Sequence, residues 1–152
     1  MTETPWLNVA EVELVYKTKV KASDRPHIIH SKDTANLLRN LWDQDKIDFV
    51  EQMNLLLLNR ANRVLGIVNI STGGVTGTVA DPKLILVSAL KANACGIIIA
   101  HNHPSGNTTP SYADQQLTQK IKMAAQYIDI RLLDHIIVTS EGYYSFADEG
   151  LL

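Results

Sequence analysis

The sequence has 152 residues, of which 45% are hydrophobic and 20% are charged, and its formal net charge of −2 gives no broad positive surface of the kind that coats DNA. Its one cysteine, Cys95, excludes an internal disulfide, a zinc ribbon and an iron–sulfur cluster, so a zinc site must use histidine and carboxylate side chains. No segment approaches the roughly 18 continuous apolar residues of a membrane span. The first residues, MTETPWLNVAEVE, lack a basic stretch followed by an apolar core, so we expect a cytoplasmic protein without membrane contact.

A strand, a helix and a hairpin are predicted in the first half of the chain. Apolar and polar residues alternate through VAEVELVYKTKV, residues 9–20, which is the pattern of a half-buried strand. After a polar turn, Ser31 has the position of a helix N-cap before apolar residues at helical spacing, which predicts a helix over residues 31–43. Two apolar runs in MNLLLLNRANRVLGIVNIS are separated by residues 59–62, so we predict a hairpin at the centre of the sheet.

The second half of the chain predicts two helices and three strands. Asp81 precedes a proline and begins a helix that ends near Asn93. The apolar run GIIIA then predicts a strand that is covered on both faces and leads directly into His101. Ser111 is placed to cap a second helix, in which apolar residues recur at helical spacing. The segments RLLDHIIV and GYYSFAD predict closing strands.

These elements predict an α/β protein with one mixed sheet and helices packed against it. No internal repeat, low-complexity tract or interdomain linker interrupts the series. We therefore expect a single domain over residues 1–152, with residues 1–8 as a flexible N-terminal extension. Exposed edges of such a sheet could pair two copies into a homo-oligomer, but the sequence does not identify which edge would do so.

The stretch HNHPSGNTTPSYAD, residues 101–114, places two histidines in a turn-rich loop after a predicted strand. Side chains at positions i and i+2 of an extended chain leave the same face, so His101 and His103 could reach one ion. Asp114 is the natural third ligand, because the proline and glycine residues between can fold the chain back toward the histidines. Catalytic zinc takes three protein ligands of these types and leaves its fourth position to water.

The residues alone leave other interpretations open. Two histidines at this spacing could equally be polar loop residues, and Asp114 stands three residues after Ser111, where it fits a helix capping box. The pair Asp134-His135 lies at the edge of an apolar strand. It fits a buried hydrogen-bonded pair better than a metal ligand, although it could orient a metal-binding imidazole from behind.

The same stretch resembles a known family. HNHPSG followed by PSYAD fits the pattern H-x-H-x(7)-S-x-x-D of the JAMM (MPN+) metalloproteases, whose fixed positions fall on His101, His103, Ser111 and Asp114. The wider sequences GIIIAHNHPSGNTTPSYADQQLTQK and LLDHIIVTSEGYYSFADEG are similar to the RadC-like JAB-domain proteins of bacteria. This resemblance covers roughly residues 48–150.

The resemblance implies a JAB/MPN fold, which is of the cytidine-deaminase-like type. It also implies one zinc ion (Zn2+) bound by His101, His103, Asp114 and a water molecule. A further glutamate is expected near the start of a central strand, and Glu51 matches this position. The residues alone could not select Glu51, because other acidic residues compete with it. These rivals are Asp45, Asp48 and Asp81.

The implied activity is that of a zinc-dependent hydrolase, a metallopeptidase that cleaves a peptide or isopeptide amide with metal-activated water. Glu51 would act as the general base and pass the proton of the water to the leaving amine. Ser111 would donate a hydrogen bond to the oxyanion, although its hydroxyl could also serve only as a helix cap. The sequence does not name the peptide or protein substrate.

Two functions of other classes stay open. The historical name of the RadC family suggests a DNA-repair or mobile-element accessory protein. The near-neutral charge and the absence of an upstream helix-hairpin-helix segment count against contact with DNA. The other alternative is a protein-binding scaffold without turnover. Scaffolds of the JAMM type usually have damaged ligand sets, whereas His101, His103 and Asp114 are all present here.

Overall fold

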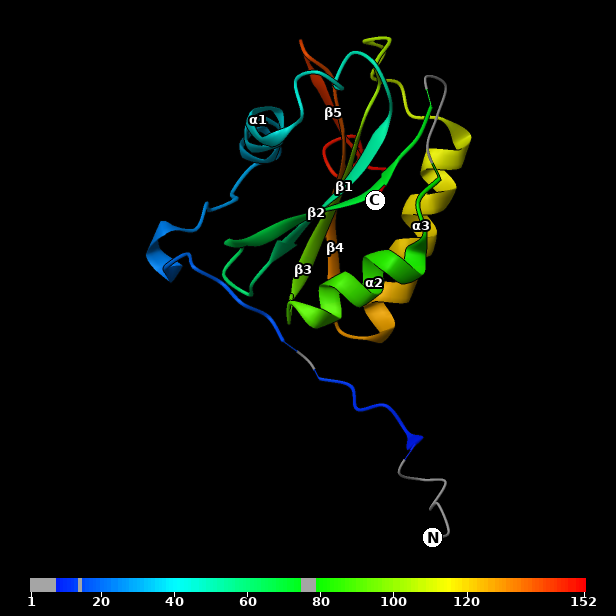
Figure 1. The fold of residues 1–152 in the computed structure, drawn as a ribbon. Helices are drawn as coiled ribbons and strands as arrows, with labels where there is room; N and C mark the ends of the chain where they lie inside the picture. Colours follow the sequence, from blue (N-terminus) through cyan, green and yellow to red (C-terminus); the bar gives the residue numbers. More distant parts are fainter. Residues whose placement is uncertain (1–7, 14, 75–78) are drawn as a thin grey trace, which may run out of the picture.

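The computed structural model describes residues 8–13, 15–74 and 79–152. From Pro26 onward, these residues form one α/β domain around a five-stranded mixed sheet (Figure 1). The predicted fold class is confirmed. The helices are the 3-10 helix η2 (Ala22–Asp24), α1 (Ser31–Leu41), α2 (Pro82–Lys91) and α3 (Tyr112–Tyr127). The strands are β1 (Gln52–Leu58), β2 (Val64–Thr72), β3 (Gly96–Asn102), β4 (Arg131–Val138) and β5 (Tyr143–Ser145). Within the described ranges, no helix is long and apolar enough to cross a membrane.

The strands lie in the order β2-β1-β3-β4-β5, with β3 in the middle. β3 runs parallel to β4 and antiparallel to β1, while the pairs β1–β2 and β4–β5 are antiparallel. The predicted hairpin is confirmed as β1–β2, and Asn59 Oδ1 accepts hydrogen bonds from the N–H groups of Ala61 and Arg63 in its turn. Its predicted central place is wrong, because β2 is an edge strand. The centre is taken by β3, which, like its neighbour β1, is buried along its whole length.

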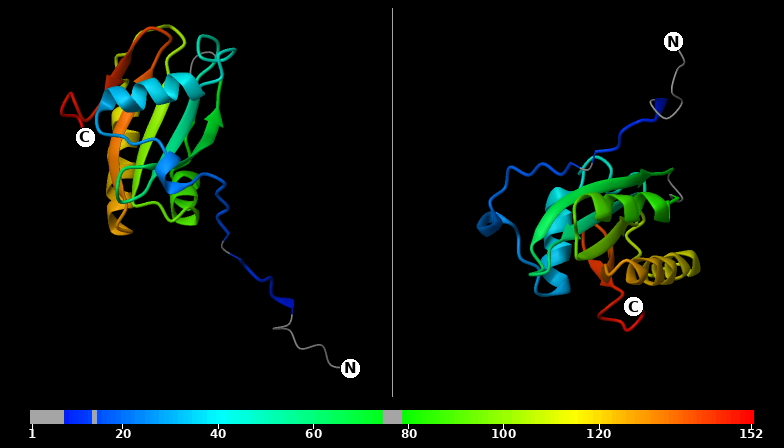
Figure 2. Two further views of the ribbon diagram at one scale, coloured as in Figure 1. Left: turned by 90° about the vertical axis from the view of Figure 1, so that its left-hand side faces the viewer. Right: turned by 90° about the horizontal axis from the view of Figure 1, so that it is seen from below.

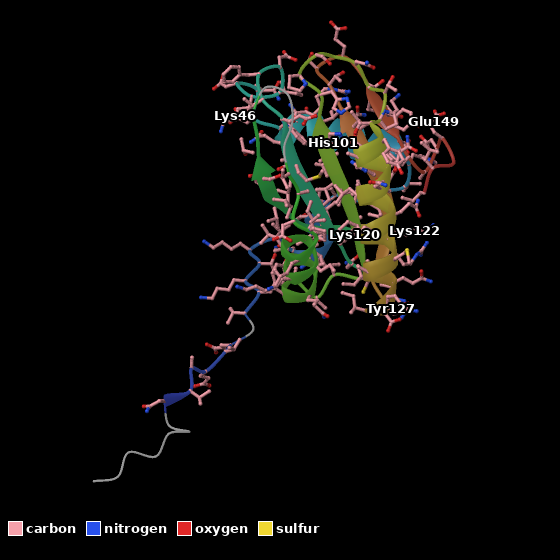
Figure 3. The ribbon with its side chains drawn as sticks, turned by 90° about the vertical axis from the view of Figure 1, so that its right-hand side faces the viewer. Lys46, His101, Lys120, Lys122, Tyr127 and Glu149 are labelled. Carbon is pink, nitrogen blue, oxygen red and sulfur yellow. The ribbon has the colours of Figure 1, made fainter. Side chains whose placement is uncertain are left out.

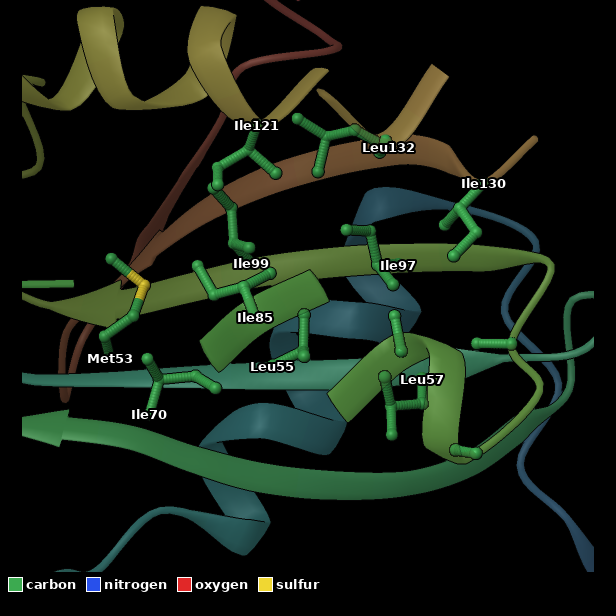
Figure 4. Packing of buried hydrophobic residues seen from close by; sticks show 14 residues of the cluster. Met53, Leu55, Leu57, Ile70, Ile85, Ile97, Ile99, Ile121, Ile130 and Leu132 are labelled. Carbon is green, nitrogen blue, oxygen red and sulfur yellow. The ribbon is translucent and has the colours of Figure 1, made fainter. Parts of the chain in front are cut away.

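Alternation along β1 and β3 divides the core into two clusters. Odd-numbered side chains, such as those of Leu55 and Ile99, pack under α2 and α3 against Ile121 (Figure 4). Even-numbered side chains, such as that of Leu56, face α1 and pack against Leu38. Figure 2 shows α1 and α3 on opposite sides of the sheet. Each large side chain that is fully buried in this way contributes about 1.5–3 kcal/mol.

The same alternation decides where the polar end of β3 points. His101 continues the odd-numbered series after Ile99, so its side chain lies on the face that α3 covers. Asn102 continues the even-numbered series and lies on the face that α1 covers. The first histidine of the motif is therefore directed toward the start of α3.

Helix α1 begins at Ser31 as predicted, but the capping residue differs. Ser31 is the first helical residue, and His30 occupies the N-cap position. The Asp33 carboxylate accepts a hydrogen bond from the backbone N–H of His30 at 2.8 Å and so closes the first turn. The helix ends at Leu41, because Trp42 has an extended backbone.

Helix α2 begins where the sequence predicts. Asp81 is its N-cap, and one carboxylate oxygen accepts a hydrogen bond from the backbone N–H of Lys83 at 2.9 Å. The helix ends at Lys91, two residues before the predicted end at Asn93. Asn93 has a φ of 53°, a left-handed conformation that cannot continue the helix.

The predicted strand over residues 9–20 is wrong. In the described part of this segment, which omits Leu14, no residue belongs to a strand, and Val12 is 85% exposed. Figure 1 shows the segment running away from the sheet, although the Tyr16 hydroxyl donates a hydrogen bond to the Leu65 carbonyl at 2.7 Å. Alternating apolar and polar residues give the side-chain pattern of a strand. The backbone N–H and C=O groups of a strand also need hydrogen bonds, and these come from a neighbouring strand.

The prediction of a flexible extension over residues 1–8 lies outside the described residues, apart from Asn8. The chain joins the fold further on, at Pro26. The Pro26 carbonyl accepts a hydrogen bond from the N–H of Val64 at 2.9 Å, and the Ile28 N–H donates to the Asn62 carbonyl at 2.9 Å. These bonds hold the start of the domain against the β1–β2 turn.

Candidate metal centre

The predicted site residues come from three elements that meet at one end of the sheet. His101 is the penultimate residue of β3, and His103 follows the strand. β1 is antiparallel to β3 with Met53 opposite His101, so Glu51 lies beside the end of β3. Asp114 lies in the first turn of α3. Figure 3 labels His101 at the end of β3, near the start of α3.

The functional atoms of these four side chains converge. Nε2 of His101 lies 2.9 Å from Nε2 of His103 and 3.4 Å from Oδ2 of Asp114. Nε2 of His103 lies 3.7 Å from the same Asp114 oxygen and 3.6 Å from Oε1 of Glu51. One ligand atom each from Glu51, His101 and His103 also lies within 4.8 Å of the other two. These three residues could therefore hold a metal ion, and Asp114 borders both histidines.

The site is partly buried and electrostatically coupled. The His101 side chain is 2% exposed, whereas those of His103 and Asp114 are 15% and 19% exposed. The Asp114 carboxylate raises the pKa of His103 above its ordinary value, although burial acts in the opposite direction. Burial alone would raise the pKa of Asp114, but the two imidazoles outweigh burial and hold this pKa well below its usual range. The Asp114 carboxylate thus favours the protonated form of His103 when no metal ion is bound.

Ser111 and Asp114 form the capping box that the sequence allowed. The Ser111 hydroxyl oxygen accepts a hydrogen bond from the Asp114 N–H at 3.0 Å, and Asp114 Oδ2 accepts one from the Ser111 N–H at 2.8 Å. The same Oδ2 atom faces both histidines. The cap and the proximity to the imidazoles are therefore compatible, because the cap holds the carboxylate in the orientation that faces the histidines.

Asn102, which the sequence reasoning missed, holds the backbone around Glu51. Its side chain is fully buried on the α1 face of the sheet. Its Nδ2 donates to the carbonyls of Ile47 and Val50 at 2.8 Å each, and its Oδ1 accepts from the N–H of Gln52 at 2.7 Å. These bonds flank Glu51 on both sides and tie it to β3. The sequence gives no signal for this role, because an asparagine in a turn-rich loop is ordinary.

His135 lies directly behind His101. Its Nε2 is 2.8 Å from Nδ1 of His101, and its Nδ1 is 2.6 Å from the hydroxyl oxygen of Thr118. The ring is fully buried and stacks on Phe146, with ring centroids 4.3 Å apart and an interplanar angle of 12°. Burial lowers the pKa of His135 well below its ordinary value. Burial therefore favours the neutral ring, and the ring has the position of a support for His101.

Asp134, the neighbour of His135 in the sequence, does not contact the His135 ring in the described structure. Its carboxylate accepts hydrogen bonds from the backbone N–H groups of His135 and Ala147 and from the Ser145 hydroxyl, at 2.7, 3.0 and 2.6 Å. Burial raises the pKa of Asp134, although these hydrogen bonds act in the opposite direction. The pair is thus buried and hydrogen-bonded as predicted, but through the backbone of His135.

A family comparison agrees with this geometry. Residues 28–151 match the RadC-like JAB domain. The chain belongs to the RadC-like JAB domain family. The match begins before the first residue of α1 and therefore covers all three α-helices and the whole sheet. It confirms the resemblance found in the sequence and extends it toward the N-terminus.

The JAB domain has similar relatives in several bacteria. It is 46% identical to a UPF0758 protein of Flavobacterium johnsoniae over 101 residues, which are 66% of this chain and 44% of the relative. It is 50% identical to one of Porphyromonas gingivalis over 103 residues, 67% of this chain and 45% of the relative. It is 43% identical to UPF0758 protein YfjY of Escherichia coli over 102 residues, 67% and 64% of the two chains. The matched part thus spans about half of most of these relatives, whose names state no activity.

Proposed function

We propose that this JAB domain is a zinc-dependent hydrolase that cleaves a peptide or isopeptide amide. The observation that carries the proposal is the convergence of His101, His103 and Asp114, with Glu51 beside them. Membership in the RadC-like JAB family supports the proposal, because the resemblance to the JAMM pattern assigns the same four residues to zinc chemistry. A peptide or protein is the proposed substrate.

The donor set suits a divalent cation. Nδ1 of His101 faces His135 and Nδ1 of His103 faces the Asn107 carbonyl, so each ring directs its Nε2 toward Asp114. A tetrahedral zinc ion with bonds of about 2.0–2.1 Å separates its ligand atoms by roughly 3.4 Å. The separations of 2.9, 3.4 and 3.7 Å among the three atoms bracket this value. We therefore assign His101, His103 and Asp114 as the ligands.

Glu51 has the proposed role of general base. Its carboxylate is close enough to His103 to ligate the same ion, at 3.6 Å from Nε2. We assign it to proton transfer because two imidazoles and the Asp114 carboxylate already complete the three protein ligands of a catalytic zinc site. A bound zinc ion would supply a water molecule with a pKa of about 7. Glu51 would accept the proton of this water and pass it to the leaving amine.

Ser111 has the proposed role of hydrogen-bond donor to the substrate. Its hydroxyl oxygen already accepts the N–H of Asp114, which leaves the hydroxyl proton for another partner. A donor directed at the negative charge that develops on the scissile carbonyl oxygen lowers the activation free energy by about 3 kcal/mol. In this proposal, one side chain caps α3 with its oxygen and assists the reaction with its proton.

Metal analysis and turnover of matched variants test the proposal. Zinc is measured by elemental analysis after dialysis in chelator-free buffer, and turnover is measured by mass spectrometry on a panel of short peptides and lysine isopeptides. We expect one zinc ion per wild-type chain, and loss of zinc and turnover in His101→Ala. Glu51→Gln should retain the zinc and lose turnover, because its amide is nearly isosteric but cannot act as a base.

Each contrary result removes a defined part of the proposal. A wild-type protein without stoichiometric zinc would overturn the metal site. Zinc loss in Glu51→Gln would place Glu51 among the ligands, and full turnover in this variant would remove the proposed base. Bound zinc without hydrolysis of any peptide or isopeptide in the panel would favour a non-catalytic scaffold.

A further inference from the structure

A continuous path of hydrogen bonds runs behind the metal centre from α3 to β3. The Thr118 hydroxyl lies 2.7 Å from the backbone carbonyl of Asp114, one turn earlier in α3. The same hydroxyl oxygen lies 2.6 Å from Nδ1 of His135, and Nε2 of His135 lies 2.8 Å from Nδ1 of His101. Thr118 and His135 are fully buried and His101 is 2% exposed, so bulk water does not compete for these contacts.

The direction of each hydrogen bond follows from the chemistry of the groups. A carbonyl oxygen can only accept, so the Thr118 hydroxyl donates its one proton to the Asp114 carbonyl. With that proton committed, the Thr118 oxygen must accept, and Nδ1 of His135 must therefore carry a hydrogen. A neutral imidazole carries one N–H only, so Nε2 of His135 accepts and Nδ1 of His101 donates.

The hydrogen on Nδ1 determines the state of the other ring nitrogen of His101, Nε2. When Nδ1 carries the hydrogen of a neutral ring, Nε2 has a free lone pair. This is the atom that faces Asp114 and His103. The opposite tautomer would place a hydrogen on Nε2 and block its use as a ligand.

The surroundings of His135 favour the neutral ring that this path requires. The ring stacks on Phe146, and the nearest acidic neighbour in the sequence, Asp134, directs its carboxylate to the backbone of His135 and Ala147 and to Ser145 instead. The His135 side chain is fully buried, where a charged ring would have no water to solvate it. A charged His135 would donate to His101 and reverse the tautomer.

We propose that Thr118 and His135 are positioning residues that hold His101 in the tautomer whose Nε2 lone pair faces the metal position. The inference rests on the metal site of the proposed function, but not on hydrolysis. The path begins at the backbone of Asp114, another proposed ligand, so it also ties the first turn of α3 to the His101 ring. Groups behind a metal-binding histidine commonly set its tautomer in this way, and their loss costs about 10–100-fold in metal affinity.

The first test needs no substitution. Long-range hydrogen–nitrogen NMR correlation of the metal-free, 15N-labelled wild-type protein reports which ring nitrogen of each histidine carries the hydrogen. We expect the hydrogen of His101 on Nδ1 and that of His135 on Nδ1. A His101 ring that carries its hydrogen on Nε2 would overturn the proposal, even if zinc binds.

A matched pair of variants tests the function of the path. Thr118→Val keeps the shape of the side chain but removes the hydroxyl, whereas Thr118→Ser keeps the hydroxyl. In competition titrations with a chromogenic zinc chelator, we expect Thr118→Val to bind zinc about 10–100-fold more weakly and Thr118→Ser to remain close to wild type. The circular dichroism and unfolding temperature of both variants report whether they are folded.

The outcomes separate this inference from the proposed function. Wild-type zinc affinity in a folded Thr118→Val variant would refute the positioning role and leave the metal site intact. Equal weakening in Thr118→Ser and Thr118→Val would assign the effect to packing, which also refutes the role. A wild-type protein that binds no zinc would refute the proposed function, while the NMR experiment would still decide the tautomer.

Discussion

At the scale of single residues, the centre is organised around which nitrogen of each imidazole faces inward. His101 and His103 each engage Nδ1 with a neighbouring group and direct Nε2 to the Asp114 carboxylate. Without a cation, the Asp114 carboxylate raises the pKa of His103 and so favours a proton on this ring, beside Nε2 of His101. A metal ion would replace this proton, because histidine binds metals in its neutral form.

The stability of the metal-free protein should therefore depend on pH. The pKa of His103 is raised above its ordinary value of 6.5, so its pairing with Asp114 stabilises the fold fully below pH 6.5 and is lost as the pH rises through the folded-state pKa. The pKa of Asp114 is lowered from its ordinary value of 3.8. The stability that the same pairing contributes is therefore present above pH 3.8 and is lost as the pH falls through the folded-state pKa of Asp114. We expect the unfolding temperature of the metal-free protein to decrease above pH 6.5, as followed by circular dichroism.

Asp114→Asn is the matched control for this pH dependence. It removes the carboxylate charge, so the decrease above pH 6.5 should become shallower than in the wild type. Zinc affinity should show the opposite trend and increase over the same pH range, because zinc displaces the His103 proton. An equal pH dependence of unfolding in wild type and Asp114→Asn would contradict the pairing.

At the scale of elements, the N-cap and the first two turns of α3 carry three of the groups that shape the centre. Ser111 caps the helix, Asp114 faces the histidines, and Thr118 connects the backbone of Asp114 to His135. The spacing between them, three and then four residues, keeps these groups on neighbouring positions of one helix face. The start of α3 therefore sets the geometry of the site as a unit.

Substitutions of Ser111 separate its two roles. Ser111→Ala removes cap and donor together and should lower the free energy of unfolding by about 1 kcal/mol as well as reduce turnover. Ser111→Asp keeps a side-chain acceptor for the cap but has no proton to donate, so it should reduce turnover with a smaller loss of stability. Ser111→Thr keeps both groups and is the control. Wild-type turnover in Ser111→Asp would show that the hydroxyl serves only as a cap.

The elements differ in how far one sequence predicts them. Local capping chemistry placed the starts of α2 and α3 correctly, because Asp81 and Ser111 act on backbone groups within three residues. The strand predicted over residues 9–20 failed because alternation does not reveal whether a partner strand is available. The hairpin was predicted, but its place at the edge of the sheet depends on pairings between distant segments.

In the candidate site, too, the sequence predicts the local features but not those that depend on distant segments. The spacing of His101 and His103 predicts their common direction, since His101 lies in the extended strand β3 and His103 directly follows it. No sequence pattern predicted the roles of Thr118 and Asn102, because these roles depend on burial and on hydrogen-bond partners that lie far away in the sequence. Glu51 was selected only by its match to the family pattern, since nothing in its own neighbourhood distinguishes it from the other acidic residues.

At the scale of the whole molecule, the sheet brings the parts of the centre together. β3 is paired with β1 on one side and β4 on the other, so Glu51 reaches His103 from the β1 side and His135 reaches His101 from the β4 side. His135 is 34 residues beyond His101 in the sequence, yet the parallel β3–β4 pairing places the two rings in contact. The hydrophobic clusters on both faces of the sheet hold this register.

The most direct test of the central claim is an anomalous difference map at the zinc absorption edge, from crystals of the wild-type protein grown with equimolar zinc. We predict one peak within bonding distance of Nε2 of His101, Nε2 of His103 and a carboxylate oxygen of Asp114, with Glu51 close by but not bound. A map without a peak at these side chains, or with a peak that Asp114 does not contact, would contradict the account.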